Sequence, residues 1–195
     1  MPFTVPPPRT PLDGGTARWY ERELGWATVA GPPVRLATGL RFDVLELPAG
    51  AGRRLLGRMG PTGPVALSGG RMRLLVAAGT AEELPGLLDW LEWGGIALDL
   101  AALGTGGRMT APLPPGREGS GAPAGSVWLR PPVPGREVES SLPALRSAPW
   151  GGADGPCLTR LVAAAAVECH RALLLSTRTG GPATRQPAPQ RFASS

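Results

Sequence analysis

Two acidic residues lie inside an otherwise apolar stretch and are the first candidates for chemistry. Asp43 and Glu46 belong to residues 34–48, which read VRLATGLRFDVLELP. A carboxylate buried among apolar side chains is costly unless it meets a cation, a hydrogen-bond donor or a positively charged partner. The groups that face these two acids therefore decide between metal chemistry and a structural role.

The predicted strand at residues 42–47 places the two acids on opposite faces of a sheet. Side chains alternate along a strand, so residues two apart share a face and residues three apart do not. Carboxylates that grip one metal pair must share a face. The partner position for Glu46 is Pro48 and that for Asp43 is Leu45, and neither residue can ligate a metal. One ligand is missing unless a β-bulge turns both acids to one side.

A glycine-containing turn and a third acid complete the set of candidates. The residues of the turn and its flank are Ser68, Gly69, Gly70, Arg71 and Arg73, and the third acid is Asp99. Backbone amides exposed at such a turn, with arginines beside them, can cradle phosphate. The commoner use of paired glycines is a plain hairpin turn, so both interpretations stay open.

Structural explanations compete with metal binding for each acid. For Asp43 we favour an ion pair with Arg35 or Arg41. For Glu46 a structural and a functional role are equally compatible with the sequence. For Asp99 we favour capping of the turn that follows it.

The composition adds an unusual balance of charges. The net charge is +5, and all 20 basic residues are arginine. Arginine suits phosphate and carboxylate, so nucleotides and nucleic acids are admissible partners. A GC-rich genome would explain the same bias equally well. Arg53, Arg54 and Arg58 are expected to form a solvated helix face, and a nucleic-acid track only as a second reading.

Several signals bear on the compartment. The N-terminus lacks the apolar run of a signal peptide, and charged residues interrupt the most apolar segment, so no membrane span is expected. Cys157 and Cys169 lie on one predicted helix about 18 Å apart, too far to bridge. We therefore expect a reduced, cytoplasmic protein without membrane contact.

The pattern of apolar residues and breakers predicts an α+β domain with helices packed on a sheet. The expected helices are residues 16–24, 50–59, 80–92 and 156–176. The expected strands are residues 26–30, 34–37, 42–47, 65–67, 73–78, 96–100, 108–111 and 126–130. Residues 16–176 form the domain, residues 1–15 and 177–195 are expected to be disordered tails, and residues 112–125 a flexible loop.

The order of short motifs resembles a known family, the N-terminal domain of bifunctional DNA primase/polymerases within the archaeo-eukaryotic primase superfamily. The motifs are Ala17-Arg18-Trp19-Tyr20, Gly25-Trp26, Leu36-Ala37-Thr38-Gly39, Ser68-Gly69-Gly70-Arg71, Leu98-Asp99-Leu100, Gly106-Gly107, Pro112-Leu113-Pro114-Pro115 and Val127-Trp128-Leu129. The resemblance covers about residues 17–130. It implies an RRM-like mixed sheet on which three acids hold two divalent metals and a histidine holds nucleotide phosphate.

The chain departs from that pattern at two of the three motifs. Glu46 best matches the first acid, but its partner position cannot ligate. Arg73 stands where the histidine is expected, with Met72 as the other alignment, and Asp99 matches the third acid. Arginine can bind phosphate but cannot act as a neutral imidazole.

The departures give three hypotheses. The first is a primase/polymerase-like protein with an eroded metal site that binds nucleotide or single-stranded nucleic acid. The second is an active nucleotidyltransferase that uses Glu46, Asp99 and Asp43 with Mg²⁺ or Mn²⁺. The third is a regulatory protein whose C-terminal helix docks on a protein partner.

Overall fold

The main sheet confirms the α+β class and is antiparallel throughout. A computed structural model describes residues 12–29, 31–60, 62–116, 126–145 and 157–179. Five strands pair in the order β6-β3-β5-β4-β8. Their bounds are β3 Asp43–Pro48, β4 Val65–Ser68, β5 Arg71–Val76, β6 Ala101–Leu103 and β8 Ser126–Arg130. Each of these neighbouring pairs is antiparallel, where a mixed sheet was expected.

The order of elements along the chain explains this strand order. The helices α2 (Ala49–Leu56) and α3 (Thr80–Trp90) are inserted to give the sequence β3-α2-β4-β5-α3-β6. With β3 and β5 as its two central strands, this is the split β-α-β-β-α-β arrangement. The same topology underlies RRM-like sheets, so the predicted sheet architecture is present, with β8 added at one edge.

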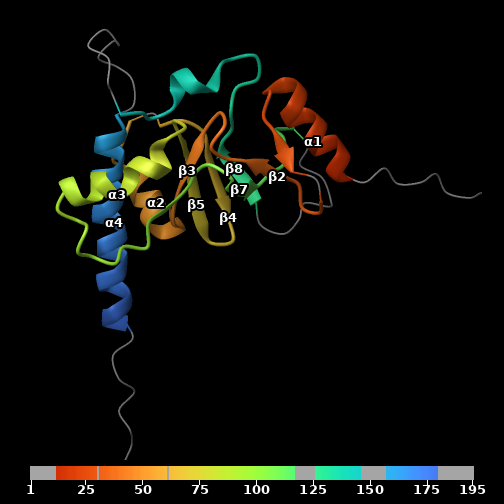
Figure 1. Ribbon diagram of the computed structural model, residues 1–195. Coiled ribbons are helices and arrows are strands. Elements are labelled where there is room, and N and C mark those ends of the chain that lie inside the picture. The colour runs from red at the N-terminus through yellow and green to blue at the C-terminus, as the bar shows by residue number, and fades with distance from the viewer. Residues whose placement is uncertain (1–11, 30, 61, 117–125, 146–156, 180–195) are drawn as a thin grey trace, which may run out of the picture.

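Three helices cover one face of this sheet. Helices α2, α3 and α4 (Leu158–Thr179) lie on the same side, and the lower half of α4 extends past the sheet (Figure 1). A core of buried apolar side chains joins them to the strands; its sheet residues include Leu45, Leu47, Met72 and Leu74. Helix α2 approaches closely at Gly52, where an added Cβ would lie 2.3 Å from the Met72 sulfur.

A second, smaller sheet and a helix cover part of the opposite face. The strands β1 (Thr28–Val29), β2 (Arg35–Ala37) and β7 (Arg108–Thr110) pair in the order β1-β2-β7. Helix α1 (Leu12–Glu23) lies beside them (Figure 1). The second core includes Tyr20, Trp26, Phe42, Val44 and Leu75, and the short helix η1 (Val138–Ser141) contributes to it. Because this cover reaches Val44 but leaves Glu46 partly exposed, the face around Glu46 stays open.

Two predicted elements differ from the structure in ways that matter. The first helix was expected to begin at Thr16, but it begins at Leu12. The low helix propensity of Gly14 and Gly15 does not prevent this, because propensity is only a weak constraint on where a helix starts. The strand expected at residues 96–100 is irregular chain with bends at Ile96 and Asp99, and β6 starts just beyond it. Leu98 and Leu100 pack against the helix-side core without pairing with a strand. Their alternate spacing, which predicted a strand, therefore reflects this packing.

Other expectations fall partly outside the described residues. Residues 1–11 and 180–195 of the predicted tails and residues 117–125 of the predicted loop are not described. Within the described part of the chain, no helix has the length and apolarity needed to cross a membrane.

Candidate functional site

Glu46 and Arg73 face each other across two central strands. They are direct partners in the register of β3 and β5. The Arg73 Nε donates to the Glu46 Oε2 at 2.7 Å, and both side chains are largely buried, at 16% and 19% exposure. A cross-strand pair of opposite charge stabilises a sheet locally. Arg73 therefore holds the Glu46 carboxylate in place at the centre of the sheet.

Arg71 extends this pair to Asp99. Its Nε lies 3.2 Å from Glu46 Oε1, and its NH1 lies 2.6 and 2.7 Å from the two Asp99 carboxylate oxygens. We call Glu46, Arg71, Arg73 and Asp99 the Glu46 network. It contains two carboxylates and two guanidinium groups, so its formal charge is balanced.

The glycine turn sets the position of Arg71. Gly69 and Gly70 both have positive φ, 55° and 78°, and Ser68 pairs with Arg71 across them. Two consecutive residues with positive φ make a type I′ hairpin, which glycine adopts without strain. The turn therefore acts as a hairpin beside the Glu46 network. Phosphate binding by its backbone amides stays a prediction.

Asp43 belongs to a different environment, as the alternation of side chains predicted. Val44 and Glu46 face the side of the small sheet, whereas Asp43 reaches the start of α3 and accepts from the Ala81 amide at 2.8 Å. Burial raises the pKa of the Asp43 carboxyl, and the amide of Ala81 opposes that rise. No ion pair of the described residues joins it to an arginine, so the expected pairing with Arg35 or Arg41 is wrong; Arg41 pairs with Glu139 instead.

The three acids therefore do not converge on one point. Glu46 and Asp99 are linked through Arg71, whereas Asp43 lies on the far side of β3. Among the residues that the structure describes, no group of three His, Cys, Asp or Glu side chains could hold a metal ion. A metal that used Glu46 or Asp99 would have to displace a guanidinium group from each.

A second group of charges joins α2 and the turn after it to α4. Glu168 is 2% exposed, and its carboxylate oxygens lie 2.8 Å from Arg54 Nε, 2.7 Å from Arg58 NH1 and 3.5 Å from Arg171 NH1. We call these four residues the Glu168 cluster. The spacing of Arg54 and Arg58 placed them on one helix face, but nothing in the sequence indicated that α4 would present a buried acid to them.

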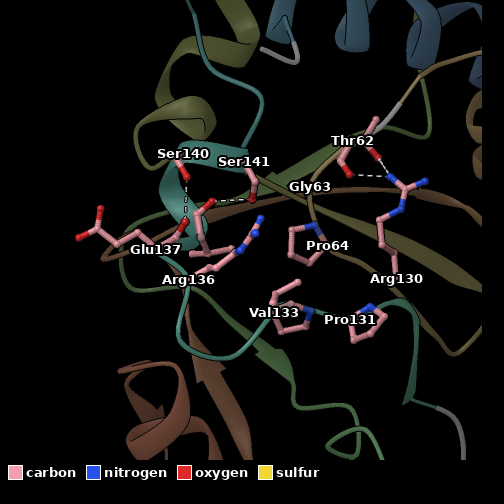
Figure 2. Close-up of a pocket in the computed structure, with 12 residues that line it drawn as sticks. Thr62, Gly63, Pro64, Arg130, Pro131, Val133, Arg136, Glu137, Ser140 and Ser141 are labelled. Carbon is pink, nitrogen blue, oxygen red and sulfur yellow. Dashed lines mark hydrogen bonds between the residues drawn. The ribbon is translucent and has the colours of Figure 1, made fainter. Parts of the chain in front are cut away.

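A hollow of about 230 Å³ opens at the other end of β4 (Figure 2). It lies between β8 and η1, and Arg130 and Arg136 contribute to its lining. The Arg130 NH1 donates to the Thr62 carbonyl at 2.5 Å and to its Oγ1 at 2.9 Å. None of the residues predicted from the sequence lines this hollow, so it is separate from the Glu46 network.

Comparison of the chain with known protein families, with characterised proteins and with solved structures found no match.

Proposed function

We propose that the protein is a non-catalytic, primase/polymerase-like module that binds single-stranded nucleic acid or nucleotide on the open face of its sheet. The observation that carries the proposal is the Glu46 network itself: Arg71 and Arg73 occupy the carboxylates that metal chemistry would need. The split β-α-β-β-α-β sheet and the order of the sequence motifs support the primase/polymerase-like part of the proposal.

The same network supplies the ligand-binding part. Arginine has five N–H donors, and the contacts of Arg71 and Arg73 with the two acids use only some of them. Phosphate oxygens satisfy such donors through charge-assisted hydrogen bonds. The carboxylates then moderate the affinity, because they already neutralise part of the positive charge.

The test compares Glu46→Gln with wild type in two assays. Anisotropy of a labelled 20-nucleotide poly-dT measures binding, and primer extension with Mn²⁺ measures catalysis. We expect Glu46→Gln to bind about three- to tenfold more tightly, a change of about 0.6–1.4 kcal/mol, because it releases guanidinium groups for phosphate. Glu83→Gln, on the exposed surface of α3, makes the same change in net charge and should alter binding much less.

The alternative function, nucleotidyl transfer, predicts a different result in the primer-extension assay. If Glu46 and Asp99 hold Mg²⁺ or Mn²⁺ for nucleotidyl transfer, wild type extends a primer and Glu46→Gln abolishes extension. That outcome would overturn our proposal.

One observation favours the third hypothesis, docking of a protein partner on the C-terminal helix. Leu173, Leu174 and Leu175 are 42%, 51% and 50% exposed on the part of α4 that extends past the sheet (Figure 1). Consecutive exposed leucines are unusual on a stretch of helix that packs on no other element. This function would show as a stoichiometric complex in size-exclusion chromatography that Leu174→Glu disrupts while binding of poly-dT is unchanged.

A further inference from the structure

The Glu168 cluster brings three arginines to a single carboxylate. Arg54 lies in the last turn of α2, Arg58 lies in the turn that follows this helix, and Arg171 is three residues after Glu168 on α4. All three guanidinium groups lie within 3.5 Å of a Glu168 oxygen. One negative charge therefore faces three positive charges, in contrast to the balanced Glu46 network.

A purely structural role does not account for this excess. One guanidinium group is enough to neutralise a buried carboxylate, and further ones repel each other. The last turn of α2 is a favourable place for Arg54 because of the helix dipole. The same reasoning does not extend to Arg171, which lies two turns before the end of α4.

The cluster also has hydrogen-bond donors to spare. The side chains of Arg54, Arg58 and Arg171 are 36%, 57% and 46% exposed. Glu168 Oε1 accepts no hydrogen bond of good geometry from the described residues, although Arg58 and Arg171 both approach it. Most N–H groups of these two arginines are therefore not committed to the acid.

We propose that the Glu168 cluster binds a phosphate group, with Glu168 acting as the buried anchor that holds the three guanidinium groups together. Guanidinium groups pair with phosphate oxygens through two parallel hydrogen bonds, and a phosphate would supply the negative charge that the cluster lacks. The phosphate is either free or part of a nucleic-acid backbone. This site lies on the helix side of the sheet and does not depend on the Glu46 network, so either proposal can fail alone.

The experiment uses the full chain and charge-neutral variants of the exposed arginines. Calorimetric titration with inorganic phosphate and anisotropy of labelled 20-nucleotide poly-dT are measured for wild type, Arg58→Gln and Arg171→Gln. Arg160→Gln is the matched control, because Arg160 is exposed on the same helix as Arg171. We expect both cluster variants to bind phosphate about tenfold more weakly, and the control to stay within about twofold of wild type.

The two sources of phosphate are separated by the poly-dT measurement. If the variants weaken poly-dT binding and inorganic phosphate competes with it, the ligand is a nucleic-acid backbone. If they weaken inorganic phosphate alone, the ligand is a free phosphate or a small phosphorylated molecule, and the site still stands.

The melting temperatures of the unliganded variants show whether weaker binding results from a damaged fold. We expect the melting temperatures of Arg58→Gln and Arg171→Gln to equal or exceed that of wild type at low salt, because each removes repulsion. If neither ligand distinguishes these variants from Arg160→Gln, the cluster only joins α2 to α4 and the proposal is overturned.

Discussion

Glu46 and Glu168 are two acids that arginines surround on opposite sides of one sheet, and they differ in the balance of charge. Glu46 shares two guanidinium groups with a second acid, Asp99. Glu168 faces three guanidinium groups alone and is almost completely buried. The Glu46 network can therefore satisfy itself, whereas the Glu168 cluster lacks negative charge.

The contrast separates two ways in which arginines can surround an acid and bind an anion. At Glu46 the arginines occupy the carboxylates, so phosphate has to compete with them. At Glu168 the single acid positions the arginines and leaves them in excess, so phosphate completes the cluster. The stronger anion site is thus expected outside the face that the sequence motifs mark.

The largest effect on stability is expected for Glu168→Gln. The variant leaves three guanidinium groups around a neutral buried amide, and removing one partner from a buried ion pair is strongly destabilising. We expect a loss of about 2–4 kcal/mol in the free energy of unfolding by urea, with partial recovery at high salt. Glu83→Gln is the control on the exposed surface. A loss below about 0.5 kcal/mol would show that the arginines reorganise freely into solvent.

Glu46→Gln should cost less, about 1–2 kcal/mol in the same measurement. Asp99 continues to neutralise Arg71, and the glutamine oxygen can still accept a hydrogen bond from Arg73. If this variant were as destabilised as Glu168→Gln, the balance of charge would not be what distinguishes the two sites.

The sequence predicts correctly which face of the sheet Asp43 and Glu46 occupy, but it does not predict which arginines pair with Glu46 and Glu168. The alternation of side chains correctly placed Asp43 and Glu46 on opposite faces, because strand geometry is local. The pairing of Glu46 with Arg73 depends on the register of β3 against β5, which the sequence does not state. The Glu168 cluster depends on how α2 packs on α4. Arg54 and Glu168, which meet there, are more than a hundred positions apart in the sequence.

Asp43 provides a carboxylate held by backbone amides instead of arginines. Burial raises its pKa in the folded state above the ordinary value of an unfolded aspartate. The ionised form therefore costs stability at neutral pH, and this cost disappears as the pH falls through the raised pKa. Asp43→Asn keeps an acceptor for the Ala81 amide without the charge, so we expect it to equal or slightly exceed wild type in stability at pH 7.

The pH series gives the sign of this effect. As the pH falls from 7 towards 4, wild type should gain stability relative to Asp43→Asn in urea unfolding. The opposite trend would show that the amides lower the Asp43 pKa more than burial raises it.

The smallest effect is expected at Cys169. Its thiol senses charges of both the Glu46 network and the Glu168 cluster. Its thiol donates to the Asp99 carbonyl at 3.5 Å, and burial, with a smaller contribution from the Asp99 charge, raises its pKa to about 11. Glu168 also raises the pKa, whereas Arg71 and Arg54 lower it. Removing the Glu168 charge should therefore lower the pKa of the Cys169 thiol. The larger fraction of thiolate then reacts faster with an alkylating reagent.

The measurement uses a Cys157→Ser background, so that iodoacetamide can react only with Cys169. We expect Glu168→Gln to accelerate native-state labelling about threefold and Glu46→Gln to leave it unchanged, because Glu46 is not among the groups that act on this thiol. Labelling through global unfolding would rise steeply with low concentrations of urea, whereas labelling governed by the pKa would not. An equal acceleration in both variants would mean that the two charged groups are one coupled unit, and the contrast between them would no longer hold.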